Sequence, residues 1–284
     1  MTHANATDQG PEPAATLAEQ SNEVASVVGV MSGKGGVGKS LVAALLACAM
    51  REAGCAVGIL DADVTGPSIP KMFGIVERPD MNELGIFPVR TRSGISAMSI
   101  NLFLDRPDGA VIWRGPLISN TVKQFWQDVF WGKLDYLLVD LPPGTADVPI
   151  TVMQSLPLDC AVIVTSPQDL ASLVVRKAVD MCRHMEVPVL GLVQNMAWLK
   201  CPKCGEIIYP FGQADGEALA REMGIPHILD LPIDPEVSAR ADAGTIEEYG
   251  GNPFSDKIDA ISNAIAAASY VKGTANRCAT DASC

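Results

Sequence analysis

The sequence lacks any apolar run long enough to cross a lipid bilayer. The longest, Leu41 to Met50, is about half of the ~20 residues that a transmembrane helix needs. It also lacks lysine–arginine clusters, and its net charge of −12 disfavours broad electrostatic binding to nucleic acid or anionic lipid. The amino terminus has no charged start followed by an apolar stretch, so no secretory signal is predicted. We therefore expect a cytoplasmic protein that binds neither nucleic acid nor membrane.

Aromatic residues are scarce, at 5% of the chain, while hydrophobic residues make up 48%. This composition suits an α/β core built from Ala, Val, Leu and Ile. The eight cysteines, in a chain without a predicted signal, indicate a reducing compartment in which disulfides are not expected. Cysteines 48, 55, 160 and 182 lie in apolar segments and are interpreted as small core residues.

Apolar segments alternate with amphipathic ones between two polar ends, residues 1–22 and 271–284, which we expect to be a disordered and a flexible tail. Short apolar runs predict strands at 27–31, 56–61, 95–100, 136–140, 160–165, 189–194 and 227–231. Helical spacing predicts helices at 41–50, 117–130, 170–185 and 215–223, and another that begins near 258. Residues 75–95 are predicted to be an irregular excursion. The alternation predicts one α/β domain over residues 23–270, with a mostly parallel sheet and helices on both faces.

A phosphate-binding loop occupies residues 33–40, Gly-Lys-Gly-Gly-Val-Gly-Lys-Ser, between a predicted strand and a predicted helix. Its glycines let successive backbone N–H groups face phosphate oxygens, and the helix that follows adds its positive N-terminal end. Lys39 is predicted to reach the β- and γ-phosphates of ATP, and the Ser40 hydroxyl to coordinate Mg²⁺. The motif therefore predicts a P-loop NTPase domain. The residues expected to contact the nucleotide here are Gly33, Lys34, Gly35, Gly36, Val37, Gly38, Lys39, Ser40 and Leu41.

Carboxylates follow two further strands, and ligands of such sheets bind at the carboxyl ends of the strands. Asp140 is predicted to hold Mg²⁺, through a water molecule, as the second acidic motif of P-loop proteins does. Asp61 and Asp63 alternate along an extended stretch and should point to opposite sides. We favour Asp63 for orienting or deprotonating the attacking water and Asp61 for supporting the metal shell, although the two roles could be exchanged. Gly144, in Leu-Pro-Pro-Gly-Thr, is predicted to offer its backbone N–H to the γ-phosphate.

A Cys-x-x-Cys pair, Cys201 and Cys204, supplies two thiolates for one metal site, whereas Zn²⁺ or an iron–sulfur cluster normally takes four ligands. Two subunits about a two-fold axis would present four cysteines, so a bridging cluster in a homodimer is favoured. Three alternatives stay open: a redox dithiol, a zinc site (within one chain, with Cys278 and Cys284, or bridging two chains), and a turn without a metal.

Three segments together resemble the deviant-Walker dimeric ATPases, which include MinD, the ParA partition ATPases, the arsenite and tail-anchored-protein ATPases and the nitrogenase iron protein. They are the loop with Lys34, Asp61-Ala62-Asp63, and the segment from Asp140 to Gly144. The resemblance implies a nucleotide-sandwich homodimer in which Lys34 reaches the partner's ATP and stabilises charge that develops in phosphoryl transfer.

A narrower resemblance, over roughly residues 24–250, is to the Mrp/ApbC family of iron–sulfur cluster carrier ATPases. It adds residues 64–70, Trp113-Arg114-Gly115-Pro116, Asn195-Met196 and the cysteine pair. It implies slow ATP hydrolysis and a labile [4Fe–4S] cluster held between two subunits by Cys201 and Cys204. The implied partners are apo iron–sulfur clients and a cluster assembly scaffold. Asn195 is implied to contact the adenine, with Pro232 and Asp234 nearby. The chain differs from some members because it lacks their small accessory domain and their N-terminal cysteine cluster, and because it adds Cys278 and Cys284.

Two other functions would need features that the sequence lacks. A spatial regulator of the MinD or ParA type would need a basic amphipathic C-terminus or a basic DNA-binding surface, and the segment after Ile265 carries only Lys272 and Arg277. An ATP-coupled electron carrier like the nitrogenase iron protein would use single, widely separated cysteines instead of a Cys-x-x-Cys pair.

Overall fold

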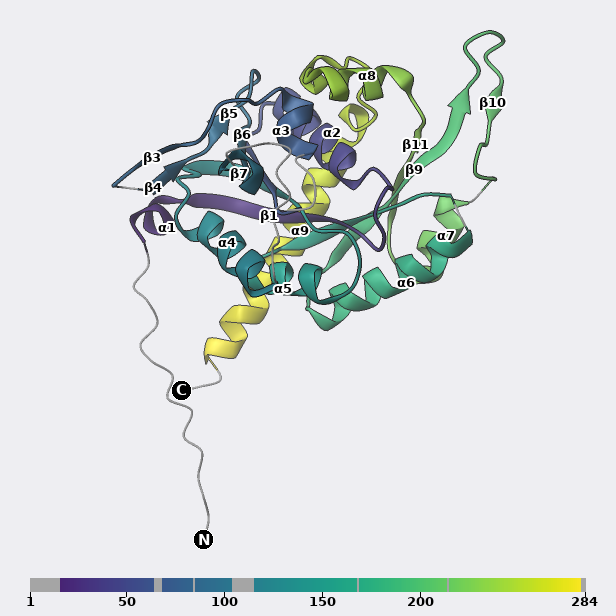
Figure 1. Ribbon diagram of the computed structural model, residues 1–284. Coiled ribbons are helices and arrows are strands. Elements are labelled where there is room, and N and C mark those ends of the chain that lie inside the picture. Colours follow the sequence, from purple (N-terminus) through teal and green to yellow (C-terminus); the bar gives the residue numbers. More distant parts are fainter. Residues whose placement is uncertain are drawn as a thin grey trace.

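The computed structural model describes residues 16–63, 68–83, 85–103, 115–167, 169–213 and 215–281. Within these residues a nine-stranded sheet has the order β10-β9-β8-β1-β7-β2-β6-β5, with β11 paired to β9 (Figure 1). Its strands are β1 (Glu23–Ser32), β2 (Val57–Asp61), β5 (Val89–Arg90), β6 (Ser96–Ser99), β7 (Lys133–Asp140), β8 (Cys160–Thr165), β9 (Val189–Lys200), β10 (Ile207–Ile208) and β11 (His227–Pro232). All pairs are parallel except β5–β6 and β9–β10. The predicted mostly parallel sheet is confirmed.

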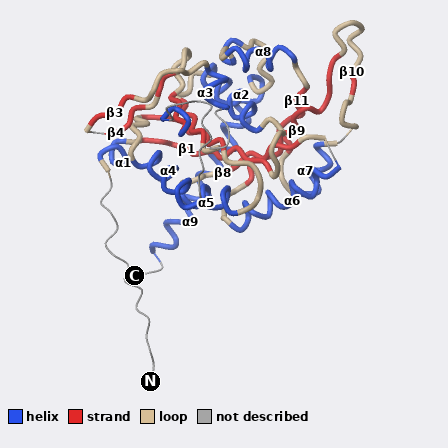
Figure 2. Tube along the Cα trace, viewed as in Figure 1, coloured by secondary structure: helices blue, strands red, loops and turns tan. Residues whose placement is uncertain are grey.

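Helices cover both faces of the sheet because its central strands are apolar on both sides: every residue of β2 and β8 is buried. One core layer lies between the sheet and α2 (Lys39–Glu52), α3 (Ser68–Phe73), α8 (Pro235–Ala243) and α9 (Ile258–Asp281). The other lies between the sheet and α4 (Gly115–Gln127), α5 (Asp147–Ser155), α6 (Asp169–His184) and α7 (Gly216–Met223). Figure 2 shows the strands running between these two sets of helices.

Three of the four predicted core cysteines are buried, Cys48, Cys160 and Cys182, whereas Cys55 is only half-buried. Burial raises the pKa of Cys182 to about 12, so this thiol stays protonated and unreactive near neutral pH. No described helix combines the length and the apolar character that a membrane crossing requires.

Several short elements were not predicted. Helices α3, α5 and α8 have six to nine residues, too few for a clear 3.6-residue period. The excursion over residues 75–95 contains an antiparallel pair, β3 (Asp80–Asn82) with β4 (Gly85–Phe87), and the edge strand β5. Strand β9 was predicted to end at Gln194, but it continues to Lys200 because β10 pairs with its last residues.

The structure describes parts of both predicted tails. Most of residues 1–22 lies outside the described residues, yet Leu17–Ser21 forms the short helix α1, where Ala18 is fully buried. At the other end α9 continues to Asp281, so the backbone of residues 271–281 is helical, and the flexibility of this tail stays a prediction.

Helices α3 and α8 meet end to end through two glycines with left-handed backbones. Gly74 follows α3 with φ 64°, and Gly244 caps α8 with φ 70°. A Cβ on Gly244 would lie 2.6 Å from the Gly74 Cα, and a Cβ on Gly74 would lie 2.6 Å from the Gly244 carbonyl oxygen. Only glycine fits both the conformation and the approach. The contact fixes where α3 and α8 lie over the P-loop.

We predict that Gly244→Ala lowers the free energy of unfolding by about 2–4 kcal/mol, from left-handed strain plus a backbone clash. Gly224→Ala is the matched control, because Gly224 caps α7 with φ 67° and nothing lies within 4 Å of its Cβ position. The control should lose only about 1–2 kcal/mol in urea unfolding. Equal losses in the two variants would show that the α3–α8 contact is not tight.

Candidate functional site

The site lies where three neighbouring parallel strands end. Strand β1 leads into the P-loop, β2 ends at Asp61 and β7 ends at Asp140. Because β7 pairs with both other strands, Asp140 lies in register with Val30 of β1 and with Asp61 of β2. The structure therefore brings together the loop and the carboxylates that the sequence predicts to form one site.

The P-loop has the shape that phosphate binding requires. Gly36 and Gly38 have φ near 80°, and nothing lies within 4 Å of a Cβ built on Gly35 or Gly36. Gly33 has another role, because a Cβ there would lie 2.1 Å from the Val174 Cγ1 of α6. Gly38 is also the N-cap of α2 and no side chain caps this end, so the positive end of the helix faces the site.

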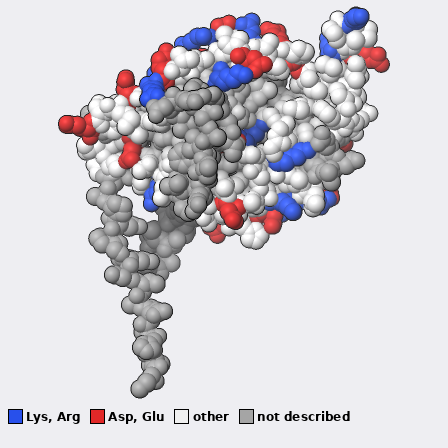
Figure 3. Space-filling model, viewed as in Figure 1, with Lys and Arg blue, Asp and Glu red and all other residues white. Residues whose placement is uncertain are grey.

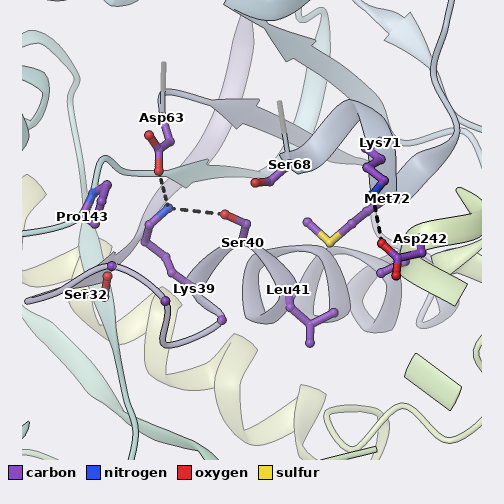
Figure 4. Close-up of a pocket in the computed structure, with 14 residues that line it drawn as sticks. Ser32, Lys39, Ser40, Leu41, Asp63, Ser68, Lys71, Met72, Pro143 and Asp242 are labelled. Atoms are coloured by element: carbon purple, nitrogen blue, oxygen red, sulfur yellow. Dashed lines mark hydrogen bonds and ion pairs between the residues drawn. The ribbon is translucent and has the colours of Figure 1, made fainter. Parts of the chain in front are cut away.

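Lys39 is buried, with 5% of its side chain exposed, and it contacts two carboxylates, of which Figure 4 shows Asp63. Its Nζ donates to the Asp140 Oδ1 at 2.6 Å and lies 3.7 Å from the Asp63 Oδ2. The same nitrogen is 3.5 Å from the Ser40 Oγ. An ammonium beside a phosphate-binding loop is placed to bind phosphate oxygens once a nucleotide competes with these carboxylates.

Asp140 provides a test of whether the site suits Mg²⁺. It is fully buried, and among the described residues its Oδ2 has no hydrogen-bond partner. Burial raises the pKa of Asp140, and the neighbouring Lys39 and Ser40 oppose this rise. A buried carboxylate oxygen without a partner, next to a serine hydroxyl, is a hard oxygen donor set of the kind that Mg²⁺ takes. The residues present therefore fit the ion.

Asp61 and Asp63 have different surroundings, as their alternation predicts. Asp61 is buried, and its carboxylate accepts hydrogen bonds from the Ser99 Oγ at 3.0 Å and from the Asp63 backbone N–H at 3.1 Å. Burial, and then the charge of Asp140, raise the pKa of Asp61 well above its ordinary value. Asp63 instead lines the cavity next to Lys39. Asp61 thus anchors the segment that presents Asp63; the roles in water activation and in the metal shell stay predictions.

Gly144 has φ 100°, which favours glycine, and its N–H donates to the Ser32 carbonyl at 2.9 Å. The predicted contact with a γ-phosphate would have to replace this bond, so that contact stays a prediction. Ser32 also donates its hydroxyl to the Lys34 carbonyl at 2.9 Å, which ties the start of the P-loop to the end of β1.

A cavity of about 410 Å³ opens over the P-loop, within the usual size range of small-molecule sites. Its far wall was missed in the sequence because it comes from the unpredicted helices, with Ser68, Lys71 and Met72 of α3 and Ala241 and Asp242 of α8. The Lys71 Nζ and the Asp242 Oδ1 are 2.9 Å apart across this wall (Figure 4). The motif residues 64–67, Trp113 and Arg114 lie outside the described residues.

Asn195 is buried in the middle of β9 and contacts the P-loop. Its Nδ2 donates to the Val37 carbonyl at 2.9 Å, and its Oδ1 accepts from the Met196 N–H. Met196 has φ 60°, a left-handed backbone that is uncommon for a residue other than glycine. Asn195 therefore joins the nucleotide loop to the strand that leads to the cysteine pair. Its implied contact with adenine stays a prediction.

The other two residues implied near the adenine lie at the end of β11, for Pro232, and at the N-cap of α8, for Asp234. Pro232 pairs with Trp198 of β9. Asp234 caps α8 by accepting from the Glu236 N–H at 2.8 Å, and its Oδ2 accepts from the Tyr249 hydroxyl at 2.7 Å. Asp234 therefore holds the first turn of α8 in place, and an adenine contact for either residue stays a prediction.

Cys201 and Cys204 lie in the turn between β9 and β10. The turn is closed by the Cys201 N–H donating to the Glu206 carbonyl at 2.8 Å and the Gly205 N–H donating to the Cys201 carbonyl at 2.9 Å. Backbone N–H groups of Cys204 and then Lys203 lower the pKa of Cys201, which favours the thiolate that binds metals. Among the described residues no group of three or more His, Cys, Asp or Glu could hold a metal ion. The described part of one chain therefore supplies two ligands.

The other cysteine candidates add no ligand that the structure describes. The Cys278 backbone belongs to α9, its side chain is outside the described part, and Cys284 lies beyond it. The alternative zinc site within one chain thus stays a prediction.

Comparison with known proteins gives consistent matches. The family model described as ParA: NUBPL iron-transfer P-loop NTPase matches residues 23–266. An iron–sulfur cluster carrier protein of Methanocaldococcus jannaschii is 42% identical over 232 residues, 81% of this chain and 80% of that protein. The cytosolic Fe–S cluster assembly factor NUBP2 of Bos taurus is 42% identical over 252 residues, 85% of this chain and 92% of its own.

Solved structures agree on the fold. A nucleotide-binding protein of Archaeoglobus fulgidus, in complex with ADP, is 45% identical with a TM-score of 0.74, over 82% of this chain and 92% of its own. The cell division ATPase MinD of Pyrococcus furiosus is 20% identical with a TM-score of 0.60, over 85% of this chain and 98% of its own. The predicted fold, one P-loop α/β domain, is confirmed.

We predict that Lys39→Met lowers the free energy of unfolding of the nucleotide-free protein by about 3 kcal/mol, because it leaves the charge of Asp140 buried without its partner. Adding Asp140→Asn should restore most of the loss, since the uncompensated charge is then removed. Urea unfolding measures both. Binding of a fluorescent ADP analogue should be lost in the single and the double variant alike. A single variant as stable as the parent would show that the ion pair does not hold α2 to β7.

Proposed function

This chain belongs to the ParA: NUBPL iron-transfer P-loop NTPase family, and from this premise we propose that it is an ATP-hydrolysing carrier that holds a [4Fe–4S] cluster between two copies and transfers it to apo-proteins. The family confirms the predicted resemblance to iron–sulfur cluster carriers and to P-loop NTPases. The dimer, the type of cluster and its transfer are the proposal.

The observation that carries the proposal is the incomplete ligand set on an exposed turn. Cys201 is half-buried and Cys204 is exposed, so both thiols are accessible from outside the chain. Two thiolates leave two positions of a four-ligand site open, and a two-fold axis through the site fills both with the same residues. A site that is complete only between two chains can also be opened when the chains move apart, which suits a cluster that is cargo.

The nucleotide site supports ATP as the second ligand. Lys39 can exchange its carboxylate partners for the β- and γ-phosphates, and Asp63 lies beside it to hold the attacking water. Mg²⁺, held by Ser40 and Asp140, would neutralise charge on the phosphates. Lys34 belongs to the same loop, and we propose that it contacts the partner's ATP. Slow hydrolysis is expected until the second copy supplies that lysine.

A hydrogen bond and one strand connect the two sites. Asn195 donates to the Val37 carbonyl of the P-loop, and Cys201 follows six residues later, directly after the end of the same strand. We propose that ATP binding and hydrolysis change the conformation of the P-loop, and that this change reaches the cysteine turn through the strand. It would then alter how tightly the cysteines bind the cluster.

The proposed partners are apo iron–sulfur proteins, a cluster assembly scaffold and a second copy of this chain. A cytoplasmic location is proposed from the bovine relative, which is named a cytosolic assembly factor. A zinc-bridged ATPase is the second candidate, because four thiolates also suit Zn²⁺. The MinD-like structures at 20% identity share the fold and carry no further argument for spatial regulation.

We predict that Cys201→Ala takes up less than about a tenth of the parent's iron and labile sulfide on anaerobic reconstitution, because a four-ligand site loses two ligands at once by symmetry. Cys55→Ala is the matched control, a half-buried thiol in the loop before β2. The control should load like the parent, with the same content of iron and labile sulfide. Equal loading of Cys201→Ala and the parent would overturn the bridging site.

We predict that Lys34→Ala retains ATP binding and loses roughly 10²–10³-fold in turnover, as expected when one donor to developing charge is removed. Lys133→Ala is the control, since that lysine is 83% exposed at the start of β7. Phosphate release measured at saturating ATP separates turnover from binding. A Lys34→Ala protein that turns over as fast as the control would rule out the proposed contact with the partner's ATP.

A further inference from the structure

Another hollow lies between α6 and α7, outside the nucleotide site. Its volume is about 550 Å³, larger than the 410 Å³ of the cavity over the P-loop. In Figure 3 the lower right edge, where Figure 1 places α6 and α7, carries Lys and Arg side chains next to acidic ones. We call this hollow the basic hollow. Its charged lining residues are Arg176, Lys177, Asp180, Arg183, Arg221 and Glu222.

The basic hollow differs in charge from the chain as a whole. The chain carries a net charge of −12, whereas the four cations and two carboxylates of the hollow leave two positive charges in excess. An acidic molecule is therefore repelled by most of the chain and attracted to this face. Such a local excess selects both the partner and the direction of its approach.

Two of the four cations already have a carboxylate partner and join or cap the helices. Arg176 of α6 donates to Glu222 of α7, and this ion pair holds the two helices together. Arg221 donates to Glu217, one turn earlier on α7, at 3.0 Å. These two side chains form the wall of the hollow, and their charges are largely neutralised.

The other two cations have no carboxylate partner in the part of the chain that the structure describes. Arg183 donates to the Met223 carbonyl at 3.0 Å, a neutral acceptor. Lys177 forms no ion pair with any described residue. Asp180 lies between them on α6, but its carboxylate is 3.5 Å from the His184 Nδ1. The excess charge of the hollow therefore resides on Lys177 and Arg183.

The spacing of these charges favours a peptide segment over a small anion. Arg176 and Arg183 are seven positions apart, about 10 Å along α6 at 1.5 Å per residue. A single phosphate cannot reach across this length, and the carboxylates of Asp180 and Glu222 would repel it. An extended segment can place its own carboxylates at the cations and its backbone N–H groups at Asp180. Clusters of cationic side chains recognise acidic motifs in this way.

Helix α6 connects this face to the P-loop. A Cβ built on Gly33 would lie 2.1 Å from the Val174 Cγ1 and 2.7 Å from the Val174 carbonyl oxygen, so the helix packs directly on the start of the loop. Leu173, the residue before, is 56% exposed, and Lys177 follows it one turn later. A partner bound along this face would lie one turn from the residue that contacts the nucleotide loop.

The same face borders the segment after β7. A neighbouring hollow of about 460 Å³ shares Lys177 and Asp180 with the basic hollow, and Thr145 lines it. Thr145 directly follows Gly144, the residue predicted to contact the γ-phosphate. The basic hollow therefore lies beside two segments that a nucleotide would contact, which suits a partner whose binding is linked to the nucleotide site.

We propose that the basic hollow is the docking surface for an acidic segment of an apo iron–sulfur acceptor, with carboxylates of that segment at Lys177 and Arg183. The choice of occupant rests on the proposed function, in which an acceptor must approach the chain to receive the cluster. The proposal adds to that function a surface on α6 and α7 that recognises the acceptor by charge.

The test is the double variant Lys177→Gln/Arg183→Gln, which removes the two cations without a carboxylate partner. The matched control is Lys133→Gln/Lys257→Gln, which removes two exposed lysines, on β7 and just before α9, and changes the net charge equally. Each protein is loaded with cluster anaerobically, and its association with an acidic apo-ferredoxin is measured at low and at high salt. A second series uses the metal-free proteins. Circular dichroism and binding of ADP check that each remains folded.

We expect the hollow variant to bind the apo-ferredoxin about five- to tenfold more weakly than the parent and the control at low salt, chiefly through slower association. The three should converge at high salt, because salt screens exposed charges. Equal association at low salt would overturn the assignment. So would a loss that does not depend on salt, because the substitutions would then act through the fold.

Inorganic phosphate serves as the competing probe. We expect it to bind the parent no more tightly than the hollow variant and to leave ferredoxin association unchanged beyond its effect on ionic strength. Phosphate that binds the parent and not the hollow variant, without association of the apo-ferredoxin, would replace the acidic segment with a small anion and overturn the proposal.

The two proposals fail in different ways. If the parent takes up no cluster, the proposed function is wrong, and the metal-free series then judges the basic hollow by itself. Equal association of the metal-free parent and hollow variant with the apo-ferredoxin would refute docking at the hollow, even where the parent holds its cluster as proposed.

Discussion

The buried ion pair between Lys39 and Asp140 is the contact on which the nucleotide site depends. It joins the first residue of α2 to the last residue of β7 at 2.6 Å, with both side chains almost fully shielded from water. The parallel register of β1, β7 and β2 makes it possible, because it places the P-loop and two strand-end carboxylates at one edge of the sheet. A nucleotide competes with these carboxylates for Lys39. Binding of a nucleotide to the P-loop therefore changes the contacts that hold α2, Asp63 and Asp140 together.

The sequence identifies those site residues that belong to a recognisable local motif. The P-loop, Asp61, Asp63, Asp140 and the cysteine pair each follow from residue type and spacing. The far wall of the cavity could not be found this way, because Lys71 and Asp242 belong to short helices that meet through Gly74 and Gly244, far apart in the chain. One signal was available for α8, since Asp234 followed by Pro235 is a typical helix start.

The full length of strand β9 could not be predicted from sequence patterns. The strand continues past Gln194, although Met196 adopts a left-handed backbone and β10 has only two residues. The contact that fixes this part of β9 is the hydrogen bond from the Asn195 side chain to the Val37 carbonyl. It joins residues 158 positions apart in the sequence. Asn195 thus links the P-loop to the strand before the cysteine turn. Because β1, β8 and β9 are parallel, that turn lies beyond the same edge of the sheet as Lys34. One two-fold axis near that edge could serve both the proposed contact of Lys34 with ATP and the proposed four-cysteine site.

The central claim is that the cluster is shared by two chains. Native mass spectrometry of protein purified without oxygen measures chain number and bound mass together. The account predicts a dominant species of two 30.0-kDa chains carrying one [4Fe–4S] cluster, which separates into cluster-free single chains when the cluster is removed. A cluster or zinc ion bound stoichiometrically to a single chain would contradict it.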